Sequence, residues 1–233
     1  MAESAPVYLA AQVRAAEKPL LDAGEPLMLR AAGALARIAL GELGARGGRV
    51  LVLAGSGDNG GDALFAGAHL AAEAGVAVDL LLTSDRVHTA GFEAAVEAGA
   101  RTIGLAEAVS AASGHDLLLD GILGIGASTS AALRGDARVI VAGLLPAVHA
   151  GRPRVIAVDV PSGLQPDDGS SDDVVLPASV TVTFGAVKAG LVRGRGPELA
   201  GRIVLVDIGL GPRLAAAGSV GTAAVAAIVQ GGG

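Results

Sequence analysis

The chain has 233 residues and a net charge of −6; 52% of its residues are hydrophobic, 2% are aromatic and none is cysteine. This composition excludes a disordered chain, disulfides and zinc–thiolate sites, and it argues against a nucleic-acid-binding protein. Because no stretch reads as a signal peptide or has transmembrane length, we expect a cytoplasmic protein that neither enters a membrane nor binds nucleic acid.

The chain begins with two segments of helical periodicity, over residues 7–24 and 25–45, which predict two N-terminal helices. Short apolar runs then predict strands, at about 49–54, 76–82, 101–104, 116–120, 153–159, 179–184 and 202–206. Helical patterns lie between the earlier strands, at about 61–74, 88–98, 105–113 and 134–150. This alternation predicts an α/β fold with a mostly parallel sheet that is covered on both faces.

The C-terminal stretch differs in composition from the rest of the chain. Residues 212–233 are rich in Ala, Gly and Val and end in Gln230-Gly231-Gly232-Gly233. We expect one domain over residues 1–211, followed by a tail that forms a terminal helix or begins a linker to a second domain.

A glycine-rich turn follows the first predicted strand. Its sequence Gly55-x-Gly57-x-x-Gly60 matches the dinucleotide fingerprint, with a strand before it and a helix after it. However, Asp58 and Asp62 would repel a pyrophosphate without a bridging cation, and the expected acid of the next strand, Asp79, falls inside that strand. The alternative is a structural turn in which Asp58 or Asn59 caps the helix.

Two more buried strands end in an acid near glycines. Asp120 precedes the run 121–126, and Asp159 precedes Val160-Pro161-Ser162-Gly163. Because the carboxyl ends of parallel strands meet at one edge, we expect both acids to lie beside the glycine-rich turn. Buried acids are costly without positive charge, and Asn, Asp and Ser oxygens suit a hard cation. The sequence therefore predicts a cation-assisted ligand site, although a single such Asp is more often a cap.

Other candidate groups give weaker signals. Lys188 follows the strand predicted at 179–184, so it either reaches the same edge or is a solvated loop lysine. The four histidines, at positions 69, 88, 115 and 149, lie in helical or loop contexts without a paired acid, which indicates structural roles. The motif Gly-x-Ser-x-Gly is absent, so an α/β-hydrolase triad is not supported.

Taken together, the motifs resemble the YjeF N-terminal domain family over roughly residues 8–211. The segments that carry the resemblance are Ala11–Glu17, Leu27–Gly33, Gly57–Leu64, Asp120–Gly126, Ala157–Gly163, Thr183–Lys188 and Val206–Gly209. No single segment is decisive, but their order and spacing are highly specific.

The enzymatic members of this family are NAD(P)H-hydrate epimerases. The resemblance implies a Rossmann-like three-layer α/β/α fold, commonly dimeric, and an isomerase that interconverts the R and S hydrates of NADH and NADPH in cofactor repair. It implies a K⁺ ion held by Asn59, Asp120 and Ser162. It also implies an ADP- or ATP-dependent dehydratase that accepts one epimer, either fused to the chain or working with it.

By motif position, the resemblance also implies the substrate contacts. These are Asp58, Asn59, Gly60, Gly61, Asp62, Gly124, Ile125, Gly126, Ala127, Ser128, Thr129, Ser130 and Asp159. Epimerisation of the hydrated carbon requires loss and return of its hydroxyl, or ring opening and closure, and both routes need a group that gives and takes a proton. We predict Asp159 as that catalytic group and Lys188 as a second candidate that stabilises charge.

The chain departs from the family pattern at two places. Asp58 stands where the family usually has Asn, and the segment Ala127–Ala131 lacks a basic residue that some members have there. The family fold also serves in scaffolding and protein-interaction roles, so a non-catalytic nucleotide- or protein-binding module is the alternative. The retained Asn59, Asp62, Asp120, Asp159 and Ser162 favour the enzyme. An ordinary NAD-dependent oxidoreductase is disfavoured by Asp58.

Overall fold

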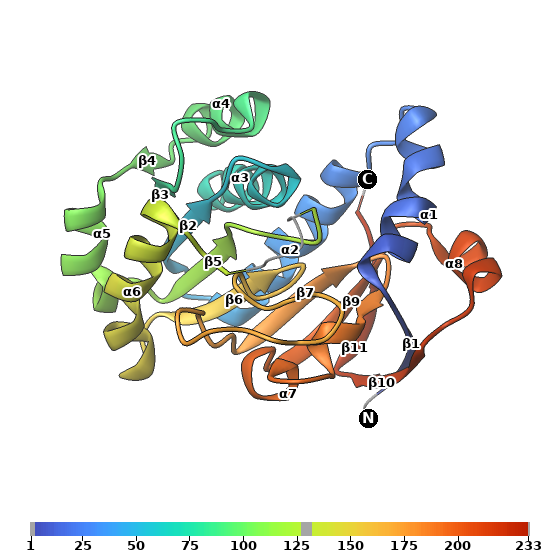
Figure 1. Ribbon diagram of the computed structural model, residues 1–233. Helices are drawn as coiled ribbons and strands as arrows, with labels where there is room; N and C mark the ends of the chain where they lie inside the picture. Colours follow the sequence, from blue (N-terminus) through green and yellow to red (C-terminus); the bar gives the residue numbers. More distant parts are fainter. Residues whose placement is uncertain (1–2, 127–131, 233) are drawn as a thin grey trace.

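The computed structural model describes residues 3–126 and 132–232, which form two sheets with helices around them (Figure 1). The larger sheet has eight strands in the order β11-β9-β7-β6-β5-β2-β3-β4, and every neighbouring pair is parallel. Its strands are β2 (Gly48–Ala54), β3 (Val76–Leu82), β4 (Arg101–Thr102), β5 (Leu117–Gly121), β6 (Arg154–Val158), β7 (Val180–Phe184), β9 (Arg202–Asp207) and β11 (Ala227–Gln230). The predicted parallel sheet is confirmed.

Helices cover both faces of this sheet. Along β2, Val50 and Val52 belong to one hydrophobic core and Leu51 and Leu53 to the other, as the alternation of side chains in a strand requires. The first core includes α2 (Leu27–Leu43), α3 (Asp58–Ala71) and α4 (Thr89–Glu97), and the second includes α5 (Leu105–Ser110) and α6 (Gly135–His149). The Rossmann-like three-layer α/β/α fold is therefore confirmed.

The remaining helices are shorter or lie outside the two layers. They are α1 (Ala10–Asp22), α7 (Gly196–Leu199), α8 (Gly211–Ala217) and the 3-10 turns η1 (Ala112–Gly114) and η2 (Ala189–Leu191). The two predicted N-terminal helices are thus α1 and α2. In the described part of the chain, none of the helices combines the length and hydrophobicity needed to span a bilayer.

Both ends of the chain join the sheets, which the sequence analysis does not anticipate. An N-terminal strand, β1 (Glu3–Tyr8), pairs antiparallel with β10 (Gly221–Val225) and parallel with β8 (Val187–Lys188). Within the stretch predicted as a helix or linker, only α8 is helical, and β11 pairs with β9. The pairing of β1 with β10 joins residues more than two hundred positions apart, so no local pattern indicates it.

The chain reverses its direction of travel across the sheet at β2. From β2 it proceeds through β3 to β4 at one edge, and it then returns to the other side of β2 with β5 and continues through β6 and β7. The carboxyl ends of β2 and β5 therefore flank a topological switch point, where open α/β sheets bind ligands.

One histidine has an acidic partner, which corrects the sequence analysis. Nε2 of His115, a fully buried side chain, lies 2.9 Å from Oδ2 of Asp79. The same carboxylate accepts hydrogen bonds from Arg49 (2.9 Å) and Arg101 (3.0 Å). Asp79 lies on β3, and its partners lie on β2, on β4 and just before β5, so sequence spacing does not reveal them. Asp79 therefore links neighbouring strands of the sheet.

We expect Asp79→Asn to lower the free energy of unfolding by about 1–3 kcal/mol at neutral pH, because it replaces a charged acceptor of three hydrogen bonds. Burial raises the pKa of Asp79, but the hydrogen bonds from Arg101, His115 and Arg49 hold it below its usual value. A carboxyl with a lowered folded-state pKa stabilises the fold above its unfolded pKa, and this contribution is lost as pH falls through the folded pKa. Denaturation of parent and variant should therefore differ at pH 7 and converge below about pH 4; a difference independent of pH would contradict the prediction.

Candidate functional site

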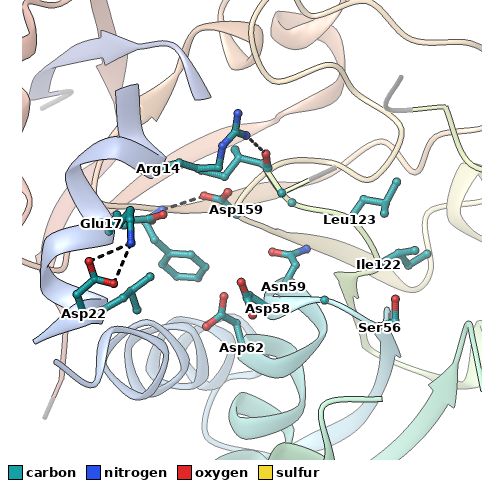
Figure 2. A pocket seen from close by; sticks show the side chains of 17 residues that line it. Arg14, Glu17, Asp22, Ser56, Asp58, Asn59, Asp62, Ile122, Leu123 and Asp159 are labelled. Atoms are coloured by element: carbon teal, nitrogen blue, oxygen red, sulfur yellow. Dashed lines mark hydrogen bonds and ion pairs between the residues drawn. The ribbon is translucent and has the colours of Figure 1, made fainter. Parts of the chain in front are cut away.

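A cavity of about 610 Å³ opens at the switch point, beside the carboxyl ends of β2, β5 and β6 (Figure 2). Four parts of the chain line it: helix α1, the turn after β2 with the start of α3, the loop after β5, and a pair formed by Asp159 directly after β6 and Phe184 at the end of β7. The site predicted at this edge of the sheet therefore exists as a cavity in the fold.

The glycine-rich turn is packed backbone against backbone. A Cβ at Gly55 would lie 2.0 Å from the carbonyl oxygen of Ile122, and a Cβ at Gly60 would lie 2.0 Å from that of Gly55. Gly57 is the N-cap of α3 and no side chain caps the helix, so neither Asp58 nor Asn59 has the capping role of the structural alternative. Their side chains are left to line the cavity.

In the described part of the chain, the side-chain amide nitrogen of Asn59 lacks a hydrogen-bond partner. The side chain is 7% exposed, and its Nδ2 has no hydrogen-bond partner among the described residues. A buried amide group without a partner is costly, so this position is suited to contact a ligand. Rotation of the amide by 180° would present the oxygen instead, so the same position serves a cation or an acceptor atom of a substrate.

Asp120 and Ser162 lie next to the cavity without lining it. The carboxylate of Asp120 is fully buried; it accepts hydrogen bonds from the backbone N–H of Ser162 (2.8 Å) and of Ile122 (3.4 Å). Burial raises the pKa of Asp120, although the hydrogen bonds from Ser162 lower it. The hydroxyl of Ser162 exchanges hydrogen bonds with the backbone of Leu123 at 2.9 and 3.3 Å. Among the described residues, no cation pairs with Asp120, and the carboxylate and hydroxyl oxygens of Asp120 and Ser162 are of the kind that hard cations bind.

Asp159 is held in an unusual conformation. It is the non-glycine residue with positive φ in the described chain, at 67°, a strained conformation that recurs at active sites. Its Oδ1 accepts from Lys188, and the Thr183 hydroxyl and the Phe184 N–H each lie 3.3 Å from it. Among the described residues, Oδ2 has no hydrogen-bond partner. Oδ1 of Asp159 is therefore held in place, whereas Oδ2 is free to contact a ligand.

Lys188 is not a solvated loop lysine, because its side chain is 1% exposed. The ammonium donates to Asp159, to Thr183 Oγ1 (3.2 Å) and to the Phe184 carbonyl (2.7 Å). These contacts use its three donors. Lys188 does not line the cavity, so its position suits holding Asp159 rather than touching a ligand.

Two other carboxyls in the cavity have altered acidity. Burial raises the pKa of Asp62 well above its usual range, and nearby carboxylates, Asp159 first among them, raise it further. Burial also raises the pKa of Glu17, against a lowering contribution from Lys188. The cavity thus combines Asp159, which is in contact with a lysine, with two acids that burial biases toward the protonated form, an arrangement suited to moving protons.

The α1 wall was missed by the sequence analysis. Arg14, Glu17, Lys18 and Leu21 line the cavity from this helix, at the i, i+3, i+4 and i+7 spacing of one helix face. Figure 2 shows Arg14 and Glu17 on the α1 side, with Asp58, Asn59 and Asp62 together on α3. The sequence signal for this wall was the i, i+3, i+4 and i+7 spacing, but a stripe of charged side chains on a helix ordinarily faces water.

The other predicted substrate contacts divide into three groups. Gly124, Ile125 and Gly126 line the cavity, as do Asp58, Asn59, Asp62 and Asp159. Gly60 and Gly61 are buried in the turn and do not line it. Ala127, Ser128, Thr129 and Ser130 lie outside the described residues.

Comparisons with known proteins agree with the motifs. Residues 24–190 match the family model described as YjeF-related protein N-terminus. A Microbacterium testaceum protein named NAD(P)H-hydrate epimerase is 58% identical over 223 residues, which cover 96% of this chain and 86% of that protein. A Clavibacter michiganensis protein of the same name is 53% identical over 87% of this chain and 90% of its own length.

Two further similarities concern chain organisation and fold. A Mycobacterium tuberculosis protein named bifunctional NAD(P)H-hydrate repair enzyme is 42% identical over 87% of this chain, which spans only 41% of that protein. The crystal structure of the yeast protein YNL200c superposes with a TM-score of 0.70 and 20% identity, covering 80% of this chain and 83% of that one. The second similarity supports the fold alone.

Proposed function

Because the chain belongs to the YjeF-related N-terminal family, we propose that it is an NAD(P)H-hydrate epimerase, an isomerase that interconverts the R and S hydrates of NADH and NADPH. The names of the relatives supply the substrate. The observation that carries the chemistry is Asp159, whose Oδ1 is held while the residue lines the cavity.

Asp159 has the properties of the required proton-transfer group. The hydrated ring carbon bears a hydroxyl and is bonded to the ring nitrogen. If the hydroxyl leaves, its oxygen takes a proton and departs as water, and a water that returns to the other face gives up a proton. If the ring opens, the hydroxyl gives up its proton as the carbon–nitrogen bond breaks. In either route Oδ2 of Asp159 accepts or returns that proton.

Lys188 acts through Asp159 in this proposal. The ammonium of Lys188 donates to Oδ1 of Asp159, to Thr183 and to the Phe184 carbonyl, so it fixes the orientation of the carboxyl group that takes part in the reaction. Since Lys188 does not line the cavity, we assign it a positioning role, with Asp159 as the catalytic residue.

The proposal includes a K⁺ ion held by Asn59, Asp120 and Ser162. A bound monovalent cation would offset the buried carboxylate of Asp120 and satisfy the side chain of Asn59. A dehydratase that consumes one epimer is the proposed partner activity, supported by the bifunctional relatives. A homodimer and a cytoplasmic location stay predictions.

We expect the purified chain to accelerate interconversion of the R and S hydrates of NADH over the spontaneous rate, and to do so better in K⁺ than in tetramethylammonium. At about 100 times its Kd, the ion should add about 2.7 kcal/mol of stability, or roughly 5–10 °C in Tm. Asp120→Asn should remove this dependence of Tm on K⁺.

The outcomes separate the candidate functions. An unchanged Tm in the two salts would contradict the K⁺ site and leave the epimerase standing. No acceleration in either salt, with a folded chain, would favour the non-catalytic binding module.

A further inference from the structure

The charges that line the cavity are unevenly distributed. Its acidic side chains are Glu17, Asp22, Asp58, Asp62 and Asp159. Its cationic side chains, within the residues that the structure describes, are Arg14 and Lys18, both on α1. A dinucleotide brings a pyrophosphate with two negative charges. Among the charged side chains of the cavity, α3 offers it only Asp58 and Asp62, whereas α1 offers both cations, beside Glu17 and Asp22, so the phosphates find positive charge on α1.

The geometry of α1 directs both cations to the cavity. They are four residues apart, so they lie one turn apart on one helix face, with Glu17 between them in sequence. The opposite face of α1 is fixed in the core by Ala10, Val13 and Ala16. The first turn of α1 is tied to the C-terminal end of α8, since Gln12 Nε2 donates to the carbonyls of Ala217 (3.2 Å) and of the C-cap Gly218 (2.9 Å).

Both cations retain capacity to bind an anion. The guanidinium of Arg14 donates to the carbonyl of Ile125, a single acceptor for a group with five donors. Lys18 pairs with Asp22 at 3.0 Å, and the two side chains are 75% and 62% exposed. Such an exposed pair adds little stability, so it is readily exchanged for a doubly charged partner.

We propose that Arg14 and Lys18 form a subsite for the pyrophosphate of the dinucleotide. The pyrophosphate then lies along α1, and the nicotinamide end lies toward Asp159 and the turn that begins α3. This inference rests on the proposed function for its ligand. Arg14 and Lys18 then supply the positive charge that the glycine-rich turn, with Asp58 and Asp62, lacks.

Equilibrium binding tests the subsite without epimerase activity. ADP-ribose, which contains the pyrophosphate and lacks nicotinamide, is titrated into the full chain by calorimetry in K⁺ buffer. We expect Arg14→Gln and Lys18→Gln each to weaken binding about tenfold, and Arg14→Lys to retain most of it. Gln at position 14 can still donate to Ile125, so the comparison isolates the charge. Arg46→Ala, an exposed cation before β2 at the other end of the strands, is the matched control.

Kinetics provide the second readout. Both Gln variants should raise KM for the NADH hydrate while kcat changes less than about twofold, because charge on the phosphate acts equally in ground and transition states. With the hydrate of reduced nicotinamide riboside, which has no phosphate, the variants should differ from the parent much less than they do with the NADH hydrate.

The two proposals can fail separately. Unchanged ADP-ribose affinity in both Gln variants would overturn the subsite, whatever the enzyme's activity. A parent chain that binds ADP-ribose through these cations but does not epimerise hydrates would retain the subsite and overturn the proposed function.

Discussion

Asp159→Asn should lower kcat for epimerisation by about 10²–10⁴-fold, because it removes the group that gives and takes the proton. Asn has nearly the same shape, tolerates the positive φ of this position, and offers an oxygen to Lys188. It cannot accept a proton under these conditions. Initial rates with each hydrate epimer, in K⁺, measure the effect.

A fold defect must be distinguished from a chemical one. The substitution leaves Lys188 buried without its counter-charge, so Asp159→Asn is compared with the double variant Asp159→Asn/Lys188→Met, in which neither charge remains. Both should be inactive, whereas the double variant should unfold at the higher temperature. Asp173→Asn, at a fully exposed position, is the control and should match the parent. A folded Asp159→Asn with the parent kcat would eliminate Asp159 as the catalytic residue.

The strand-end acids were predictable because each has a local signal. Asp120 and Asp159 directly follow apolar runs and precede glycines, and parallel strands bring such ends to one edge. The glycine-rich turn was predictable from its pattern as well, and the structure gives the reason for its glycines: a Cβ at Gly55 or Gly60 would collide with a backbone carbonyl oxygen. The central layers of the fold follow from the same alternation of strands and helices.

The contacts between distant segments were not predictable. The partner of Lys188 depends on how the chain turns from β7 into β8, which pairs with β1, and two residues of strand give no periodicity. Strand β1 contains a proline, and it pairs with β10, which lies far along the chain. The inward face of α1 is charged, so its pattern suggests solvent exposure until the acidic cavity is known.

Lys188→Met should lower the free energy of unfolding by about 3–5 kcal/mol, the usual cost of removing one partner from a buried ion pair. The side chains of Lys188 and Asp159 are 1% and 8% exposed, so water does not replace the lost partner. Met has a similar unbranched shape and leaves little empty volume. Denaturant unfolding of the two single variants and the double variant measures the coupling.

The double-variant cycle also tests what the pair is for. If the pair mattered only for stability, Asp159→Asn/Lys188→Met would recover stability and folded Lys188→Met would keep the parent's kcat. If Lys188 instead positions Asp159, folded Lys188→Met should lose kcat with KM nearly unchanged, because Oδ1 of Asp159 is no longer held. The expected result is recovered stability in the double variant together with a lowered kcat in Lys188→Met; an unchanged kcat would assign Lys188 to packing alone.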